Sequence, residues 1–137
     1  MDCGNNISVW GFGFYFGKNR DSKDEFIEQN YVTINYSEDE APEFIEMMKE
    51  IKVGDIVYLK SWGIRNNTLH ICAVGVVTSE MNTDTHIISV NWLIDDINKE
   101  VTPNKKYRQR VASIYKEYNN EIKTLIFDLI NKTDCRN

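Results

Sequence analysis

The sequence has 137 residues, 42% of them hydrophobic and 27% charged, and its formal net charge is -5. This length fits one domain with a single substantial core, so we expect one domain over residues 1–137, and no apolar run approaches the roughly 18 residues that a membrane span needs. The negative net charge argues against a protein that coats nucleic acid through phosphate contacts alone, because such binding depends on a basic surface.

The first predicted element is a strand over residues 7–16, which includes the aromatic stretch WGFGFYFG. A period of two places Trp10, Phe12, Phe14 and Phe16 on one face of this strand. Glycines alternate with these rings, and a glycine inside a strand often marks the close approach of another backbone or a ligand. We expect Phe14 and Phe16 to fill the core, and Trp10 and Phe12 to line an opening.

Two helices are predicted next, on either side of a strand over residues 31–37. The candidate N-caps are Asp21 or Ser22 for the first helix and Ser37 or Asp39 for the second. Pro42 fits the first turn of the second helix, where a missing N–H is tolerated. This helix carries an apolar stripe at helical spacing, made of Phe44, Ile45, Met48 and Ile51.

Three strands follow, over residues 56–62, 69–79 and 86–93, and they predict an antiparallel meander because their connections are too short for a crossover helix. After a basic loop over 98–110, a strand is predicted over 111–118. The last element is a helix capped by Asn119 or Asn120, and its buried face is expected to hold Ile122, Leu125, Ile126 and Leu129. This order predicts an α+β fold, a mostly antiparallel curved sheet or small barrel braced by about three helices.

Charge is unevenly distributed along the chain. Residues 21–50 hold ten acidic residues and two lysines, whereas residues 99–118 hold six basic residues and two acidic ones. Two interpretations stay open: a basic functional face on an acidic molecule, or solvated faces on opposite sides of a globule.

The cysteines and the N-terminal segment bear on the compartment. Cys3, Cys72 and Cys135 are odd in number and far apart, which favours reduced thiols over a disulfide framework or a zinc site. The segment MDCGNNIS lacks the basic and then apolar pattern of a signal peptide. We therefore expect a cytoplasmic protein.

Four stretches, WGFGFYFG, IKVGDIVYLKSW, AVGVVTS and VNWL, occur together in an order that resembles the EVE branch of the PUA-like superfamily. The resemblance runs from Val9 to Leu93, and the turn at Gly54 and Asp55 is its best single match. It implies a PUA-like pseudobarrel that binds DNA or RNA and holds a modified, flipped base in an aromatic pocket without catalysis. It also implies a place in or beside prokaryotic restriction or phage-defence systems. The acidic helix between strands and the lack of a fused nuclease or NTPase depart from the commoner members and leave the substrate class open.

A flipped base needs ring faces for stacking, polar groups for its edge and a cation for its phosphate. The candidates for the base pocket are Trp10, Phe12, Tyr36, Lys60, Ser61, Trp62, Asn91 and Trp92. The candidates for phosphate contact are Arg65, Lys105, Lys106, Arg108 and Arg110. Lys60 and Trp62 share one face of their strand with Ile56 and Tyr58 and lie at the strand exit, where barrel mouths hold ligands.

An enzyme is not expected, because no nucleophile with a base, metal-binding spacing or phosphate-binding loop is evident. His70 and His86 lack the spacing of metal ligands, and the glycines of the first strand do not match the dinucleotide-binding fingerprint. We expect no catalytic residue, no metal and no cofactor.

Three functions stay open. The leading hypothesis is a non-catalytic reader of a modified base in nucleic acid, and its mark is a salt-dependent affinity for an oligonucleotide. The second is a cytoplasmic sensor that binds a nucleotide or nucleoside in the same pocket, with little salt dependence. The third is a protein-interaction module that uses the acidic residues 21–50, is inert toward both ligands and retains a stable partner.

Overall fold

The structure is a computed structural model that describes residues 7–14, 22–34, 39–63, 68–95, 97–101 and 114–131. For residues 62 and 63 the description covers the backbone. Along the chain the elements are β1 (Val9–Gly13), α1 (Lys23–Gln29), β2 (Tyr31–Val32), α2 (Pro42–Lys49), β3 (Ile56–Gly63), β4 (Thr68–Val77), β5 (Ile88–Ile94), β6 (Lys99–Val101), β7 (Ile114–Lys116) and α3 (Asn120–Ile130).

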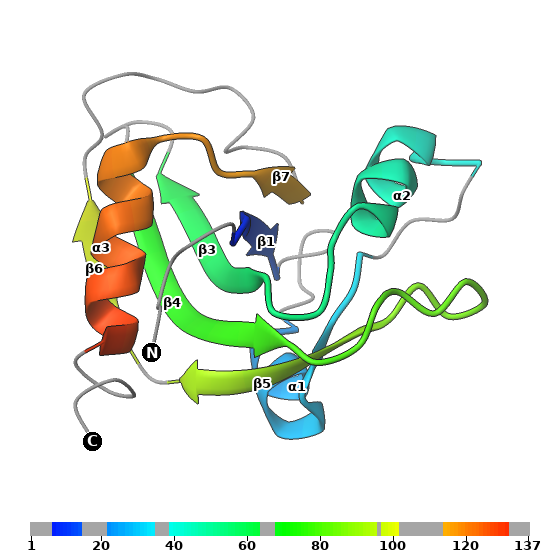
Figure 1. Ribbon diagram of the computed structural model, residues 1–137, viewed down its shortest axis with the longest axis horizontal. Coiled ribbons are helices and arrows are strands. Elements are labelled where there is room, and N and C mark those ends of the chain that lie inside the picture. The colour runs from blue at the N-terminus through cyan, green and yellow to red at the C-terminus, as the bar shows by residue number, and fades with distance from the viewer. Residues whose placement is uncertain are drawn as a thin grey trace.

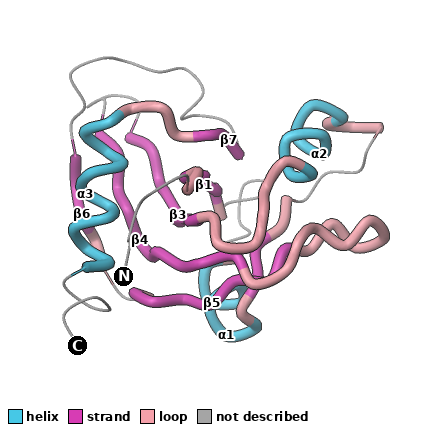
Figure 2. Tube along the Cα trace, in the orientation of Figure 1, coloured by secondary structure: helices cyan, strands magenta, loops and turns pink. Residues whose placement is uncertain are grey.

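Within these described ranges, seven strands form one curved sheet in the order β2-β5-β4-β3-β1-β7, with β6 also paired to β4 (Figures 1 and 2). The strands β3, β4 and β5 are the predicted antiparallel meander. Three helices brace the sheet (Figure 1). The predicted class, an α+β fold with a mostly antiparallel curved sheet, is therefore confirmed.

The first strand makes the one parallel pairing among the described strands. Its register with β3 runs from Val9 opposite Ile56 to Gly13 opposite Lys60. A parallel pair needs a long crossover, and the segment between these strands contains α1 and α2. β1 thus lies between β3 and β7, in the interior of the sheet.

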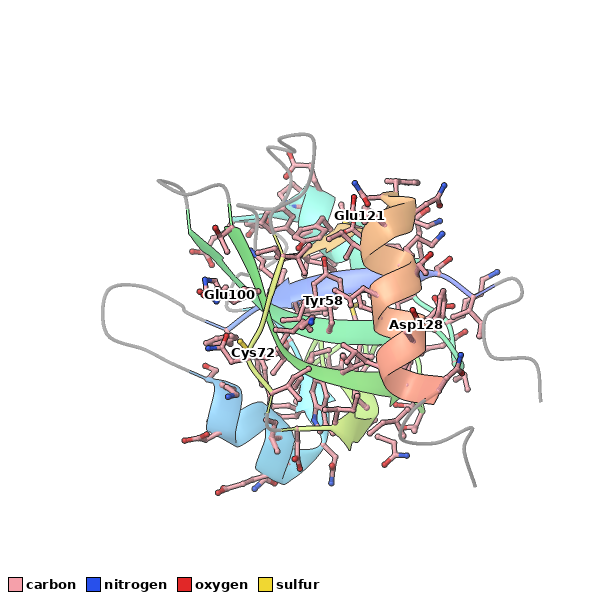
Figure 3. The ribbon with its side chains drawn as sticks, turned by 90° about the vertical axis from the view of Figure 1, so that its left-hand side faces the viewer. Tyr58, Cys72, Glu100, Glu121 and Asp128 are labelled. Carbon is pink, nitrogen blue, oxygen red and sulfur yellow. The ribbon has the colours of Figure 1, made fainter. Side chains whose placement is uncertain are left out.

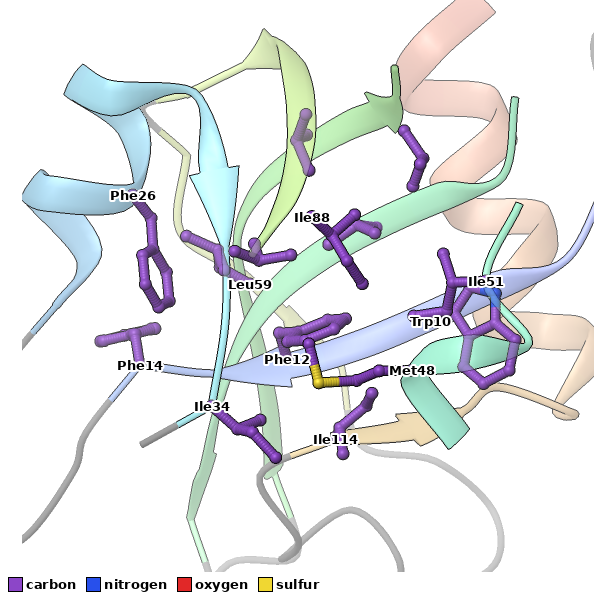
Figure 4. Packing of buried hydrophobic residues seen from close by; sticks show 14 of the residues in the cluster. Trp10, Phe12, Phe14, Phe26, Ile34, Met48, Ile51, Leu59, Ile88 and Ile114 are labelled. Carbon is purple, nitrogen blue, oxygen red and sulfur yellow. The ribbon is translucent and has the colours of Figure 1, made fainter. Parts of the chain in front are cut away.

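Both faces of the sheet are buried, each against different helices. On one face, the α1/α2 core contains Trp10, Phe12, Phe14, Phe26, Val32, Ile34, Ile45, Met48, Ile51, Val57, Leu59, Ala73, Val77, Ile88, Val90 and Ile114 (Figure 4). On the other face, the α3 core contains Val9, Ile56, Tyr58, Leu69, Ile71, Val74, Tyr115, Ile122, Ile126 and Ile130. The alternation predicted for β1 is confirmed, because Trp10, Phe12 and Phe14 lie on one face and Val9 on the other.

The helix ends differ in part from the predicted ones. Ser22 is the N-cap of α1, and Asn119 is the N-cap of α3, where its side chain accepts a hydrogen bond from the Ile122 N–H. The prediction of Ser37 or Asp39 as the N-cap of α2 is wrong: the helix begins at Pro42, and Ala41 is its N-cap. The fixed φ of proline suits the first helical position, so the proline decides where this helix starts.

Two strands also differ from their predicted ranges. β2 is confined to Tyr31–Val32, while residues 35–37 of the predicted strand and Phe16 lie outside the described residues. β6 lies in the segment predicted as a basic loop, and its Val101 pairs with Leu69 of β4. In the part of the chain that the structure describes, no helix is long and apolar enough to span a membrane.

Candidate functional site

Trp10 and Asp55 join the first strand to the turn before β3. Trp10 is 1% exposed, and its Nε1 donates a hydrogen bond to Asp55 Oδ2 at 3.0 Å. Asp55 is 7% exposed and also accepts from the backbone N–H groups of Ser8 at 3.3 Å and Lys52 at 3.0 Å. Gly54 has a φ of 95°, which only glycine adopts without strain. The turn matched by the resemblance therefore positions a buried carboxylate that holds the Trp10 indole.

Phe12 does not line an opening. It is 0% exposed and lies in the α1/α2 core, where Figure 4 shows Met48 and Ile114 beside it. The helices α1 and α2 pack their apolar side chains on this face of the sheet, so no face of the Phe12 ring is open to a base. The prediction of Phe12 as a pocket residue is wrong.

Trp92 holds α1 against the sheet. Its Nε1 donates to the carbonyl of Phe26, the buried residue of α1, at 2.9 Å, and its half-buried ring packs against the α1/α2 core. A Cβ on Gly75, its cross-strand neighbour, would lie 2.9 Å from the Trp92 ring. These contacts are structural, whereas the neighbouring Asn91 is exposed.

Lys60 lies on the opposite face of the sheet from Trp10 and Phe12. It is 6% exposed, and its Nζ is 5.5 Å from the centroid of the Tyr115 ring, in the α3 core. The predicted common face of Ile56, Tyr58 and Lys60 is confirmed, and it separates Lys60 from Trp10 and Phe12, with which it was grouped.

The remaining predicted site residues are only partly described. Ser61 is half-buried in β3, and the backbone of Trp62 pairs with Leu69. The others lie outside the described residues: Tyr36, Arg65, Lys105, Lys106, Arg108 and Arg110.

A buried polar cluster occupies the α3 core, and the sequence analysis missed it. The hydroxyl of Tyr58, labelled in Figure 3, lies 2.7 Å from the Tyr115 hydroxyl and donates to Glu117 Oε1 at 2.7 Å. Glu117 Oε2 accepts from the N–H of Asn119 at 3.0 Å, which ties the cluster to the start of α3. Burial raises the pKa of Tyr58 well above its ordinary value, and Tyr115 and Glu117 add to this effect.

Gly11, one of the glycines that alternate with the aromatic rings of the first strand, lies against this cluster. A Cβ on Gly11 would lie 2.5 Å from Cζ of Tyr115, so the glycine makes room for a tyrosine ring. Gly11 pairs with Tyr58 on one side and Tyr115 on the other, and the two hydroxyls meet across it. The close approach predicted from the sequence is real, but its partner is a side chain of the same chain.

Burial makes Lys60 a source of pH-dependent stability. Loss of water around its ammonium lowers its pKa from 10.5 to about 8. Between these values the unfolded state binds more protons than the folded state, so the free energy of unfolding rises as the pH rises through this window. We expect a gain of about 2 kcal/mol between pH 7 and pH 10 in urea denaturation.

One variant and one further titrating residue test this prediction of pH-dependent stability. Lys60→Met is expected to lose the rise, because it removes the titrating group, and an equal rise in that variant would contradict the assignment to Lys60. Above about pH 10 the slope should reverse, because Tyr58 keeps its proton in the folded state and loses it in the unfolded state.

A pocket of about 230 Å³ lies between α2 and β7 and is lined by Trp10, Met47, Glu50, Tyr115, Lys116 and Tyr118. Lys116 Nζ lies 5.6 Å from the Trp10 ring centroid and 5.7 Å from that of Tyr118. Tyr118 is 69% exposed. The sequence analysis missed Lys116 and Tyr118, although the period of two past Ile114 places both on the side of Trp10.

Comparison with protein-family models and with curated protein sequences gives no match. Among solved structures, the chain is similar to the YTH domain of Pho92, solved in complex with m6A, over 98% of this chain and 92% of that one, with 15% identity and a TM-score of 0.53. It is also similar to the YTH domain of the Zygosaccharomyces rouxii MRB1 protein, in complex with N6-methyladenosine RNA, over 95% and 90% of the two chains, with 13% identity and a TM-score of 0.52.

These likenesses establish the fold. The protein has a YTH-like fold, which is related to the PUA-like domains, and the predicted PUA-like architecture is confirmed. Membership of the EVE branch stays a prediction.

Proposed function

We propose that the protein is a non-catalytic nucleic-acid-binding module that reads a modified base. The observation that carries the proposal is the likeness of nearly the whole chain to two domains whose structures hold N6-methyladenosine. The likeness covers the full sheet and its helices, so the proposal concerns the domain as a unit and not one local motif. Under this proposal the chain has no catalytic residue and acts in the cytoplasm, as a member of the EVE branch in prokaryotic restriction or phage defence.

Trp10 and Phe12 are buried in the α1/α2 core and Trp92 is anchored to α1, so Tyr36 and Trp62 are left among the five rings predicted for the base pocket. We assign the base to Tyr36 and Trp62, with the half-buried Ser61 at its edge. The ammonium and guanidinium groups of Arg65, Lys105, Lys106, Arg108 and Arg110 supply the positive charge for the phosphates. Four of these five residues lie within positions 105–110, so the sequence concentrates positive charge there. An acidic protein needs such a local excess of positive charge to bind the phosphates of a nucleic acid.

Fluorescence anisotropy with short oligonucleotides tests the function. We compare single- and double-stranded RNA and DNA that differ only in one N6-methyladenosine, at two salt concentrations. We expect about tenfold tighter binding of one methylated strand, because a buried methyl group in a fitted pocket discriminates by this order, and weaker binding at the higher salt concentration. Trp62→Ala should weaken binding by about 1 to 3 kcal/mol through loss of a stacking ring, whereas Trp62→Phe should retain most of it.

The other outcomes separate the alternatives. Equal affinity for methylated and unmethylated strands would overturn the reader of N6-methyladenosine, and the same series with 5-methylcytosine then tests the other common modification. Binding of the free nucleoside with little dependence on salt would favour the small-molecule sensor. A folded protein that binds neither would favour the protein-interaction module.

A further inference from the structure

The pocket between α2 and β7 combines a cation with aromatic rings. Of its lining residues, only Trp10 was among those predicted from the sequence for the base pocket. Lys116 lies between the rings of Trp10 and Tyr118, with its ammonium less than 6 Å from both centroids. Trp10 is fixed by its hydrogen bond to Asp55, so this wall of the pocket is held in place by a buried contact. Tyr118 stands on the rim with most of its surface in water.

We propose that this pocket binds one nucleotide of a single-stranded nucleic acid, with its base stacked on Tyr118 and its phosphate on Lys116. The inference rests on the proposed function and adds a second subsite to it. Single-strand binding proteins combine these two elements, an aromatic side chain for the face of the base and a cation that follows the backbone. The pocket supplies both from residues two positions apart in the chain.

The size and charge of the pocket suit one nucleotide. Its volume of about 230 Å³ lies below the range of about 300–1,000 Å³ typical of sites for drug-sized ligands, so it fits a ring system the size of a base. Glu50 lines the pocket from the end of α2, whereas Lys116 lines it from β7. A phosphate is repelled by Glu50 and attracted by Lys116, so the charges orient the nucleotide with its phosphate toward β7.

Two variants and two matched controls test the subsite in the full chain. With a single-stranded oligonucleotide, Tyr118→Ala should weaken binding about tenfold, whereas Tyr118→Phe, which keeps the ring, should bind like the wild type. Lys116→Gln should reduce the slope of log affinity against log salt by about 0.7, the effect of one lost phosphate contact. Lys49→Gln removes the same charge from α2, but Lys49 pairs with Glu46 at 3.1 Å, and the salt slope should not change. Circular dichroism verifies that each variant is folded.

The preference for the methylated strand separates this inference from the proposed function. Weaker binding of Tyr118→Ala with an unchanged ratio of methylated to unmethylated affinity supports the second subsite. If the wild type prefers the methylated strand and both variants match it, the subsite is wrong and the reader stands. If the wild type shows no preference but the variants still lose affinity, the reader of this base is wrong and the subsite stands. The same variants are also titrated with free adenosine monophosphate. If they lose affinity for this nucleotide but not for the oligonucleotide, the placement of a strand nucleotide in the pocket is wrong. If the wild type binds no oligonucleotide, both the subsite and the proposed function are wrong.

Discussion

Replacement of Trp10 with alanine is expected to lower the free energy of unfolding by about 3 to 5 kcal/mol, the range for a large ring removed from a core. The indole is 1% exposed, packs in the α1/α2 core and donates to Asp55. The variant therefore loses apolar burial and leaves a cavity, and the carboxylate loses one donor. Urea denaturation followed by far-ultraviolet circular dichroism measures the loss.

Trp10→Phe is the matched control for this variant. It keeps an aromatic ring in the core but lacks the donor to Asp55, so we expect a loss of about 1 to 2 kcal/mol. A Trp10→Ala protein as stable as the wild type, with weakened oligonucleotide binding, would contradict the structural role and return Trp10 to the base pocket.

Asp55→Ala is the second large effect, at about 3 kcal/mol of unfolding free energy. Its carboxylate accepts from the Trp10 indole and from the backbone N–H groups of Ser8 and Lys52. All three donors are at least partly buried and lose their acceptor in the variant, and an unsatisfied buried group costs about 1 to 3 kcal/mol. The same denaturation experiment measures the effect.

Asp55→Asn and a double-mutant cycle refine this second prediction. Asn keeps one acceptor oxygen, so we expect a smaller loss than with alanine. In the cycle of Asp55→Ala with Trp10→Phe, the losses should fall short of additivity by about 1 kcal/mol, because both substitutions remove the same hydrogen bond. Strict additivity would show that the indole and the carboxylate contribute independently.

Local patterns sufficed for much of the fold. The period of two in the first strand placed Trp10, Phe12 and Phe14 on one face, and the short connections predicted the antiparallel pairing of β3, β4 and β5. Asn119 marked the start of α3, and Pro42 lies in the first turn of α2 as predicted, because the effects of these residues on a free N–H and on φ act within one turn. The start of α2 itself was predicted too early. The apolar stripe predicted for the second helix contributed Ile45 and Met48 of α2 and Ile51, just past the end of α2, to the core.

The candidate site could not be predicted from such patterns. The alternation of a strand shows which residues share a face, but it does not show whether that face meets solvent or a helix. α1 and α2 cover the face of Phe12, so the ring predicted at an opening is core. Lys60 and Trp10 were predicted to share one pocket, but the register of β1 with β3 places their side chains on opposite faces of the sheet. The pocket at Lys116 and Tyr118 needs α2 and β7, which are distant in the chain and meet beside Trp10 of β1.

The amino-acid pattern alone thus determined the class of fold, the alternation of its strands and most of its helices, since these depend on interactions within a few residues. Tertiary structure decided the parallel pairing of β1 with β3, the burial of Trp10 against Asp55 and the assembly of the polar cluster at Tyr58 and Glu117. The physical reason is that each of these features joins residues more than 40 positions apart. Their contacts depend on how the sheet closes and on which face each helix covers. Neither property can be predicted from a local periodicity of the sequence.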